Sequence, residues 1–339
     1  MSPADLQSIT ARPVLTIENL VTEIRSVRGL IRPVDGVSMS FPAGRIVGIV
    51  GESGSGKSMT AFSIMQLFPS SAARIAGGRV LLGEADLVGL TAEEMRVIRG
   101  ARIGMIFQDP TSFLNPVLTI GRQIEQQLHA HRWTGGPSEG VRGAGYADRV
   151  GDLLTSVGLP RDVASRYPHQ LSGGQCQRVG IASALACDPD LIIADEPTTA
   201  LDVTIQAQIL RLMMSLQRER SVALMLITHD LGVVAEVCDY VYVMYAGRIV
   251  EEAPVSELFV SPQHPYTRAL MSGVLSLTGT GDIGFAVSGS VPDLAAPPSG
   301  CRFHPRCPHA MPRCSKEAPP LFDRPSGRSA CWLHDEAAT

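Results

Sequence analysis

The sequence lacks any hydrophobic run long enough to cross a membrane. Among its 339 residues, uninterrupted apolar stretches such as Val222 to Ile227 fall far short of the roughly 20 residues that a spanning helix needs. The first residues include Asp5 and lack the charged-then-apolar layout of a signal peptide. We therefore expect a cytoplasmic chain that meets a membrane only at its surface.

The sequence also lacks a block of basic residues. Lysine and arginine number 29 against 33 aspartate and glutamate residues, a net charge of −4, which argues against nucleic acid as the main partner. Internal repeats and low-complexity tracts are missing as well. Hydrophobic residues make up 45% and charged residues 18%, which excludes global disorder and predicts a sizeable core. The length allows one large domain with an extension, or two domains.

Closely spaced cysteine pairs are absent too. Four of the seven cysteines fall between 301 and 331, separated by five, six and sixteen residues, which is not the usual zinc-ribbon spacing. These four are Cys301, Cys307, Cys314 and Cys331. In the cytoplasm they are expected to be reduced or metal-bound, and they can ligate an iron–sulfur cluster or zinc, or remain unliganded. The other three are expected to pack as small apolar side chains: Cys176, Cys187 and Cys238.

A glycine-rich stretch organises the rest of the chain. It reads Gly51-Glu52-Ser53-Gly54-Ser55-Gly56-Lys57-Ser58 and lies between the apolar run 46–50 and the helix-compatible segment 59–65. Glycines let the backbone aim several N–H groups at an anion, and the helix N-terminus adds partial positive charge. Lys57 would reach the β- and γ-phosphates of a nucleotide, and the Ser58 hydroxyl would ligate Mg²⁺. The stretch therefore predicts a phosphate-binding loop between a strand and a helix, not an ordinary surface turn.

Other candidate residues follow apolar strands. Leu191 to Ala194 is wholly apolar, as in strands buried on both faces of a parallel sheet, and it delivers Asp195 and Glu196 to the strand's carboxyl end. Ligands bind at that end in open α/β sheets. His229 directly follows the run 222–228, and Gln108 directly follows the run 102–107.

The remaining pattern predicts alternating strands and helices. Short strands are expected at 14–17, 37–41 and 77–83, and a hairpin should join 240–245 to 248–250. Helices are expected after the N-cap Thr91, at 119–131, near 148–157, beyond 173 and at 203–219, with an exposed glycine-rich loop at 134–145. Prolines crowd in from about 261, where we place a domain boundary.

Taken together, the motifs are similar to those of the ATP-binding subunit of ABC transporters, over roughly residues 14 to 260. Residues 51–58 resemble the Walker A loop, 191–196 Walker B, Gln108 the Q-loop glutamine and His229 the switch histidine. The family signature is Leu171-Ser172-Gly173-Gly174-Gln175, and the D-loop is Ala200-Leu201-Asp202.

Three further segments resemble the oligopeptide/dipeptide importer subfamily. They are Gln108-Asp109-Pro110 with Leu114-Asn115-Pro116, Tyr167-Pro168-His169, and His264-Pro265-Tyr266-Thr267. That subfamily also carries a cysteine-bearing C-terminal extension. The resemblance implies a [4Fe–4S] cluster held by Cys301, Cys307, Cys314 and Cys331.

The resemblance implies an α/β fold of the P-loop NTPase class. Its RecA-like core carries an antiparallel β subdomain and a helical subdomain that bears the signature, at about 110–178. The nucleotide-binding domain would span 12–260, and residues 261–339 would form a small extension with the cysteine cluster.

The resemblance also implies the cofactors ATP and Mg²⁺. Ser58, Gln108 and Asp195 would hold Mg²⁺, directly or through water. Nucleotide contacts would come from Ile24 and from Gly51, Glu52, Ser53, Gly54, Ser55, Gly56, Lys57, Ser58 and Met59. Ile24 replaces the aromatic residue that stacks on adenine in the family, so it can pack on the base without ring stacking.

Catalytic roles follow from the same resemblance. Glu196 would accept the proton of the attacking water or orient that water, and His229 would contact the γ-phosphate. Gln108 would link that phosphate to a membrane subunit. The signature 171–175 would serve ATP held by the opposite subunit, with Asp202 in the D-loop.

The implied function is ATP hydrolysis that energises import of peptides or similar small solutes. The expected partners are a second ATPase subunit, two membrane permease subunits and a periplasmic or extracellular substrate-binding protein, without nucleic acid. The chain would lie at the cytoplasmic face of the plasma membrane. Two alternatives remain: a soluble ABC ATPase acting on nucleic acid or ribosomes, and a non-hydrolysing scaffold.

Overall fold

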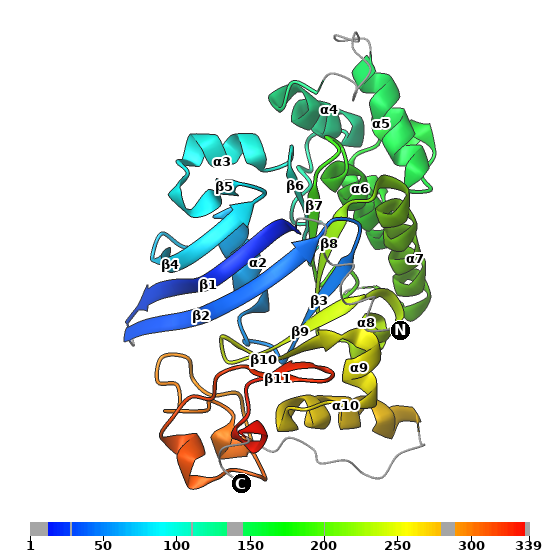
Figure 1. Cartoon of the computed structure of the whole chain (residues 1–339). Helices are drawn as coiled ribbons and strands as arrows, with labels where there is room; N and C mark the ends of the chain where they lie inside the picture. Colours follow the sequence, from blue (N-terminus) through cyan, green and yellow to red (C-terminus); the bar gives the residue numbers. More distant parts are fainter. Residues whose placement is uncertain are drawn as a thin grey trace. The chain divides into compact units, whose positions relative to one another are not determined.

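The computed structural model describes residues 13–27, 29–109, 111–133, 145–199, 201–278 and 289–335 (Figure 1). The chain forms two compact units, and each draws on separate stretches of sequence. Unit 1 contains the described parts of 1–14, 41–45 and 89–226, and unit 2 contains those of 15–40, 46–88 and 227–339. The domain limits expected at 12–260 and 261–339 stay a prediction.

One sheet of unit 2 is antiparallel, with the strand order β2-β1-β4-β5. Its strands are β1 (Pro13–Ser26), β2 (Gly29–Pro42), β4 (Ala73–Leu82) and β5 (Ala85–Asp86). Strands β1 and β2 each run for 14 residues, well beyond the short strands expected at 14–17 and 37–41. The part of β1 beyond 14–17 contains a buried carboxylate. Glu23 is almost fully buried, and Arg32 and Arg74 neutralise it at 2.9 Å and 3.0 Å.

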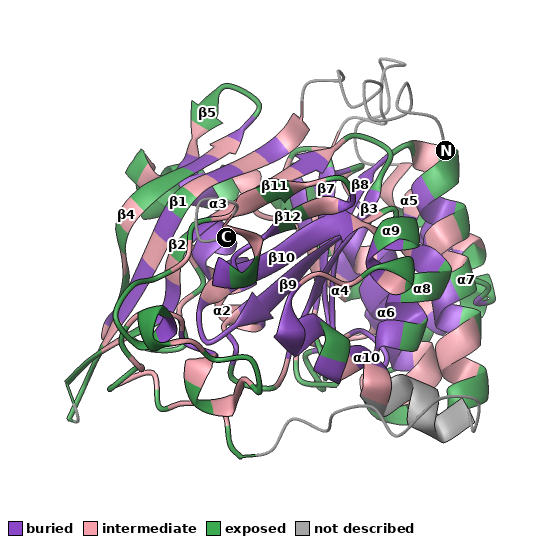
Figure 2. Ribbon diagram, turned by 60° about the horizontal axis from the view of Figure 1, so that its bottom comes forward, coloured by how far each residue is buried: buried purple, intermediate pink, exposed green. Residues whose placement is uncertain are grey.

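The second sheet of unit 2 has the order β11-β12-β10-β9-β3. The strands are β3 (Ile46–Val50), β9 (Tyr240–Tyr245), β10 (Arg248–Pro254), β11 (Phe322–Arg324) and β12 (Gly327–Ser329). Strand β3 is buried throughout and pairs in parallel with β9, and the expected β9–β10 hairpin is present. Figure 2 shows the same burial along β9 and β10. Strand β12 pairs with β10 through Glu251 and Ser329. The described C-terminal residues 289–335, called the C-terminal segment below, therefore extend this sheet.

The helices of unit 2 are α2 (Lys57–Met65), α8 (Leu231–Val237), α9 (Val255–Val260) and α10 (Pro265–Thr278). Short 3₁₀ turns cover Leu87–Gly89, His304–Arg306, Pro312–Ser315 and Trp332–His334. One core cluster joins Val243 and Tyr245 of β9 to Tyr266 of α10 and to Phe303. The C-terminal segment therefore shares its core with the sheet, which accounts for how so short a segment is ordered.

Unit 1 carries the remaining described α-helices. They are α3 (Ala92–Ile98), α4 (Ile120–Ala130), α5 (Gly145–Ser156), α6 (Gly173–Ala184) and α7 (Val203–Arg220), with 3₁₀ turns at Arg161–Ser165 and Pro168–Gln170. As expected, Thr91 caps α3, in a capping box with Glu94. Strands β6 (Ile103–Ile106) and β7 (Leu191–Asp195) pair in parallel, and β8 (Ala223–Thr228) follows β7 in the strand order. Residues 110, 134–144 and 200, which carry parts of the expected loops, lie outside the described residues.

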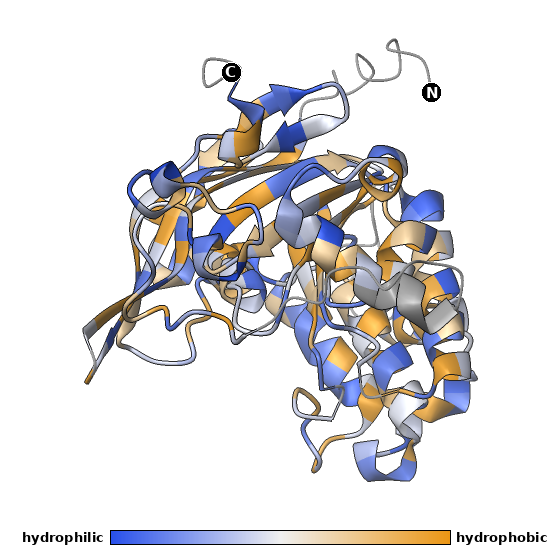
Figure 3. Ribbon diagram, turned by 90° about the horizontal axis from the view of Figure 1, so that it is seen from below, coloured by the Kyte–Doolittle hydropathy of each residue, from blue (hydrophilic) through white to orange (hydrophobic). Residues whose placement is uncertain are grey.

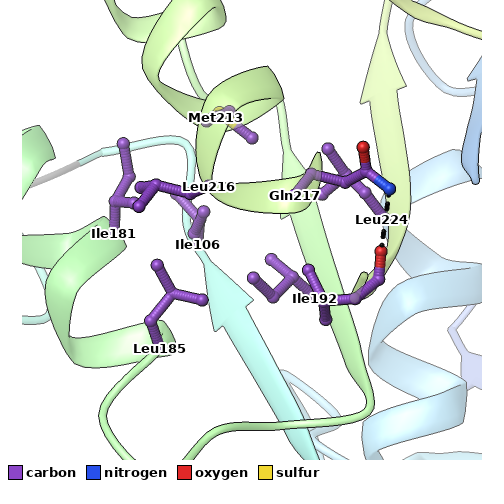
Figure 4. Close-up of a pocket in the computed structure, with 9 residues that line it drawn as sticks. Ile106, Ile181, Leu185, Ile192, Met213, Leu216, Gln217 and Leu224 are labelled. Atoms are coloured by element: carbon purple, nitrogen blue, oxygen red, sulfur yellow. Dashed lines mark hydrogen bonds between the residues drawn. The ribbon is translucent and has the colours of Figure 1, made fainter. Parts of the chain in front are cut away.

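A small apolar pocket in unit 1 lies among side chains from α6, α7 and the neighbouring strands (Figure 4). Its volume of about 10 Å³ is at the lower limit for one water molecule, and its lining offers few polar partners. We interpret it as a packing gap and not as a ligand site.

Across the part of the chain that the structure describes, no helix combines the length and apolar composition needed to cross a membrane. Figure 3 agrees with this, since its helices alternate between hydrophilic and hydrophobic residues.

Candidate functional site

The phosphate-binding loop of unit 2 follows β3 and leads into α2. Two of its glycines leave no room for a side chain. A Cβ on Gly51 would lie 2.1 Å from the carbonyl oxygen of Met244, and one on Gly56 would lie 2.0 Å from that of Pro33. Gly56 also has φ of 106°, a conformation that favours glycine. The backbone is thus packed tightly behind the loop, while Ser53 and Gly54 at its tip are exposed.

The end of the loop offers positive charge. Helix α2 begins at Lys57, and its N-cap Gly56 has no side chain to occupy the first N–H groups of the helix. Lys57 is buried, and its Nζ donates to the carbonyl oxygens of Gly51 and Glu52 at 2.8 Å and 3.0 Å. Ser58 and Met59 follow in the first turn, half-buried. A cradle of N–H groups beside a fixed ammonium group suits a phosphate chain.

The loop has contacts that sequence reasoning did not find. The N–H of Glu52 donates to the hydroxyl of Tyr266 at 2.8 Å, and its carboxylate pairs with Arg306 at 2.8 Å. Tyr266 belongs to the segment 264–267 that resembles the importer subfamily, which was the one available signal.

The acidic pair of unit 1 ends strand β7. Asp195 is the last residue of the strand and is 5% exposed, while Glu196 follows with φ of 45°. The carboxylate of Glu196 accepts hydrogen bonds from Gln108 Nε2 at 3.1 Å and from Thr199 Oγ1 at 2.9 Å. The structure therefore brings together two of the residues predicted for catalysis, Glu196 and Gln108, and adds Thr199, which sequence reasoning missed.

The signature of unit 1 starts helix α6. Leu171 precedes the N-cap Ser172, whose hydroxyl accepts the N–H of Gln175 at 3.3 Å, while Gln175 Oε1 accepts the N–H of Ser172 at 2.9 Å. Ser172 and Gly173 are exposed, and Gly174 is half-buried. The signature thus lies at an exposed helix start, and its role as an anion site stays a prediction. Asp202 is the exposed N-cap of α7, and Ala200 lies outside the described residues.

The other predicted nucleotide contacts lie in unit 2. His229 is exposed and directly follows β8, immediately before Asp230, the N-cap of α8. Ile24 is half-buried on β1, where it pairs with Ala73 of β4.

The four C-terminal cysteines lie on turns of unit 2 and influence one another. Cys301 donates its N–H to the carbonyl oxygen of Cys314 at 2.8 Å. Burial raises the pKa of the Cys301 and Cys331 thiols to about 11, and the charge of the neighbouring cysteines adds to both pKa shifts. Within the described residues, however, no group of three or more His, Cys, Asp or Glu side chains is arranged to hold a metal ion. The expected cluster therefore stays a prediction.

Comparison with known proteins agrees with this arrangement. A family model described as "ABC transporter" matches residues 34–199, and one described as "Oligopeptide/dipeptide transporter, C-terminal region" matches residues 250–314. The chain is 46% identical to the oligopeptide transport ATP-binding protein AppD of Bacillus subtilis, over 95% of this chain and 97% of AppD. It is 45% identical to the dipeptide transport ATP-binding protein DppD of the same organism, over 96% of each chain.

A solved structure supports the fold. The ATP-binding cassette MJ0796, described as a dimer in a post-hydrolysis state bound to ADP and Pi, superimposes with a TM-score of 0.62 and 29% identity, over 71% of this chain and 98% of that one. The expected P-loop α/β fold is confirmed. With relatives this similar over almost its whole length, the chain belongs to the ABC transporter family, among its ATP-hydrolysing ATP-binding subunits.

Proposed function

We propose that this chain hydrolyses ATP to drive import of peptides or similar small solutes through a separate membrane channel. AppD and DppD are named for oligopeptide and dipeptide transport, and the C-terminal region matches that of such transporters. The proposed partners are a second ATPase subunit, two permease subunits and a substrate-binding protein outside the membrane. The chain would act at the cytoplasmic face of that membrane. These likenesses favour the importer over action on nucleic acid.

The phosphate-binding loop is the observation that carries the proposal. Its closely packed glycines and the pre-positioned Lys57 form a rigid cradle, and such a cradle binds the triphosphate with little rearrangement. We assign the nucleotide contacts to 51–59 and to Ile24. Ser58, Gln108 and Asp195 would hold Mg²⁺, because their oxygen atoms are the ligands that this ion prefers. Mg²⁺ would neutralise charge that develops on the phosphates.

Glu196 is proposed to orient the attacking water and accept its proton. Its carboxylate already has donors from Gln108 and Thr199, so its orientation is fixed before nucleotide arrives. Gln108 would thereby couple the base to the segment that follows it, where Val117 is 75% exposed and suits contact with a permease subunit. His229 would contact the γ-phosphate, and the signature 171–175 with Asp202 would serve the ATP of the opposite subunit.

The test compares the wild-type chain with Lys57→Ala. Mg-ATP binding is measured by calorimetry, and phosphate release is measured with and without the co-purified membrane partners. The wild type should bind and hydrolyse ATP, and its turnover should rise with permease and binding protein present. The variant should do neither, because the charge on the β- and γ-phosphates is no longer matched. A wild-type chain that takes up no Mg-ATP, alone or with partners, would contradict the proposal.

The four C-terminal cysteines are proposed to ligate a [4Fe–4S] cluster that stabilises the fold of the C-terminal segment. Supporting this, all four thiols are free and lie on turns of one unit, and each is buried or half-buried. Burial raises the pKa of the Cys301, Cys307 and Cys331 thiols, which favours their protonated form, so cluster uptake should release protons and improve with rising pH. Iron and zinc analysis after anaerobic purification decides between cluster, zinc and unliganded cysteines. Protein without iron would rule the cluster out.

A further inference from the structure

Two residues from the C-terminal part of unit 2 hold Glu52, the second residue of the phosphate-binding loop. The guanidinium of Arg306 donates two hydrogen bonds to the Glu52 carboxylate, at 2.8 Å and 3.0 Å. The hydroxyl of Tyr266 accepts the backbone N–H of Glu52 at 2.8 Å. Both the side chain and the main chain of Glu52 are therefore fixed by residues that are 254 and 214 positions away in sequence.

This contact is partly buried. The side chain of Arg306 is 8% exposed and that of Glu52 is 25% exposed. Arg306 also donates to the hydroxyl of Tyr245 at 3.2 Å, and its guanidinium lies over the Tyr245 ring at 5.7 Å. The rings of Tyr245 and Tyr266 are 4.6 Å apart, so the two partners of Glu52 rest on one aromatic cluster. A bidentate arginine–carboxylate pair in such a setting is stronger than an exposed ion pair, and its geometry is better defined.

A second arginine of the same segment supports another part of the loop. Arg302 is buried and donates to the carbonyl oxygen of Ala246 and to the Asp35 carboxylate. The N–H of the next residue, Gly247, donates to the carbonyl oxygen of Ser55 at 2.8 Å. The segment that contains Arg302 and Arg306 thus reaches the loop directly at Glu52 and, through one turn, at Ser55.

We propose that Arg306 and Tyr266 are positioning residues for ATP binding, because they hold Glu52 and so keep the phosphate-binding loop in the shape that receives the triphosphate. Glu52 brings a negative charge to a loop that binds a polyanion, and the Arg306 guanidinium cancels that repulsion. The inference rests on the proposed role of residues 51–58. It also gives the segment 264–267 a function, since this segment delivers the Tyr266 hydroxyl to the loop.

Three substitutions test the contact. Arg306→Gln should raise the Kd and the KM for Mg-ATP about tenfold and change kcat by less than about twofold, since ground-state and transition-state binding are lost together. Arg306→Lys keeps the positive charge but loses the bidentate hydrogen bonding of the guanidinium, so the Kd and the KM should rise about threefold. Tyr266→Phe removes only the acceptor for the Glu52 N–H, and about threefold weaker binding is expected. Arg268→Gln, an exposed change on α10, is the matched control and should leave all three constants unchanged.

The double variant Glu52→Gln/Arg306→Gln is decisive. Removing the unpaired carboxylate should recover part of the lost affinity, because the repulsion of the triphosphate disappears while the hold on residue 52 stays missing, whereas a merely structural arginine would give no recovery. Thermal unfolding of each variant shows whether it folds. If Arg306→Gln does not fold, the comparison of Arg306→Lys and the double variant with the wild type tests the inference. Wild-type affinity in Arg306→Gln, or no recovery in the double variant, would overturn the inference.

Lys57→Ala separates this inference from the proposed function. If Lys57→Ala binds Mg-ATP as the wild type does, the loop is not the nucleotide site and the proposed function itself fails. If Lys57→Ala loses binding while Arg306→Gln retains it, only the positioning role fails.

Discussion

Acid should destabilise unit 2 through the buried His264. This side chain is 1% exposed; its Nδ1 accepts the N–H of Tyr266 at 3.0 Å, and its ring lies 5.7 Å from that of Phe303. Burial is the main cause that lowers the pKa of the imidazole to about 3, and the positive charges of His334 and Arg268 act in the same direction. In the unfolded chain the pKa returns to about 6.5.

The sign and size follow from proton linkage. Because the folded pKa lies below the unfolded one, the unfolded chain takes up the proton first as the pH falls. The contribution of His264 to stability is therefore complete above about pH 6.5 and is lost as the pH falls towards about 3. Each pH unit below 6.5 removes about 1.4 kcal/mol, so at about pH 5 the free energy of unfolding should be lower by about 2 kcal/mol.

The assay compares urea unfolding at about pH 7.5 and about pH 5. Trp332 is buried in unit 2, so its fluorescence reports on that unit once Trp133 of unit 1 is replaced by Phe. His264→Gln can still accept the Tyr266 N–H but cannot titrate, so it should lose about 2 kcal/mol less than the parent between the two pH values. His129→Gln, an exposed change, is the control.

Buried carboxyl groups act in the opposite direction. Burial raises the pKa of Glu251 and Glu252, so each of them adds stability as the pH falls through its raised pKa. Glu251 and Glu252 are present in both the parent and His264→Gln, so their contributions cancel when the two are compared. An equal loss of stability in His264→Gln and its parent would refute the reasoning.

Three further predictions concern the nucleotide site and the cysteines. Glu196→Gln should retain ATP binding and slow phosphate release about 100- to 10,000-fold, as for a lost general base; near-normal turnover would remove Glu196 from that role. Gly56→Ala should abolish ATP binding, because the new Cβ would lie 2.0 Å from a backbone carbonyl oxygen, whereas Gly89→Ala meets open space and should bind normally in the same titration. Cys331→Ser should remove the iron of anaerobically purified protein while Cys187→Ser keeps it, and equal iron in both would speak against the cluster.

Local patterns predict much of the fold. The apolar runs of β3, β7 and β8, the capping box at Thr91 and the hairpin turn at 246–247 each involve neighbours in sequence, so the pattern alone indicates them. The full length of β1 was not predicted, because the burial of Glu23 depends on two arginines from other strands. The contact between Gln108 and Glu196 likewise joins residues 88 positions apart, and sequence supplied only the two candidates.

The contact between Glu52 and Arg306 shows more clearly that local patterns do not predict long-range contacts. Nothing about Arg306 in sequence distinguishes it from other arginines, and its partner lies 254 positions away. Only the folded chain shows that a tail segment touches the phosphate-binding loop.

The merged core of unit 2 bears on how this protein can be engineered. Phe303 and Tyr266 pack into the same cluster as β9, and burying each large side chain contributes on the order of 1.5–3 kcal/mol. Cutting the chain near 261 to obtain a minimal cassette would expose this aromatic surface and remove β12, one of the two strands that pair with β10. Minimal versions of this subunit should therefore keep residues 289–335, which supply Phe303 and strand β12.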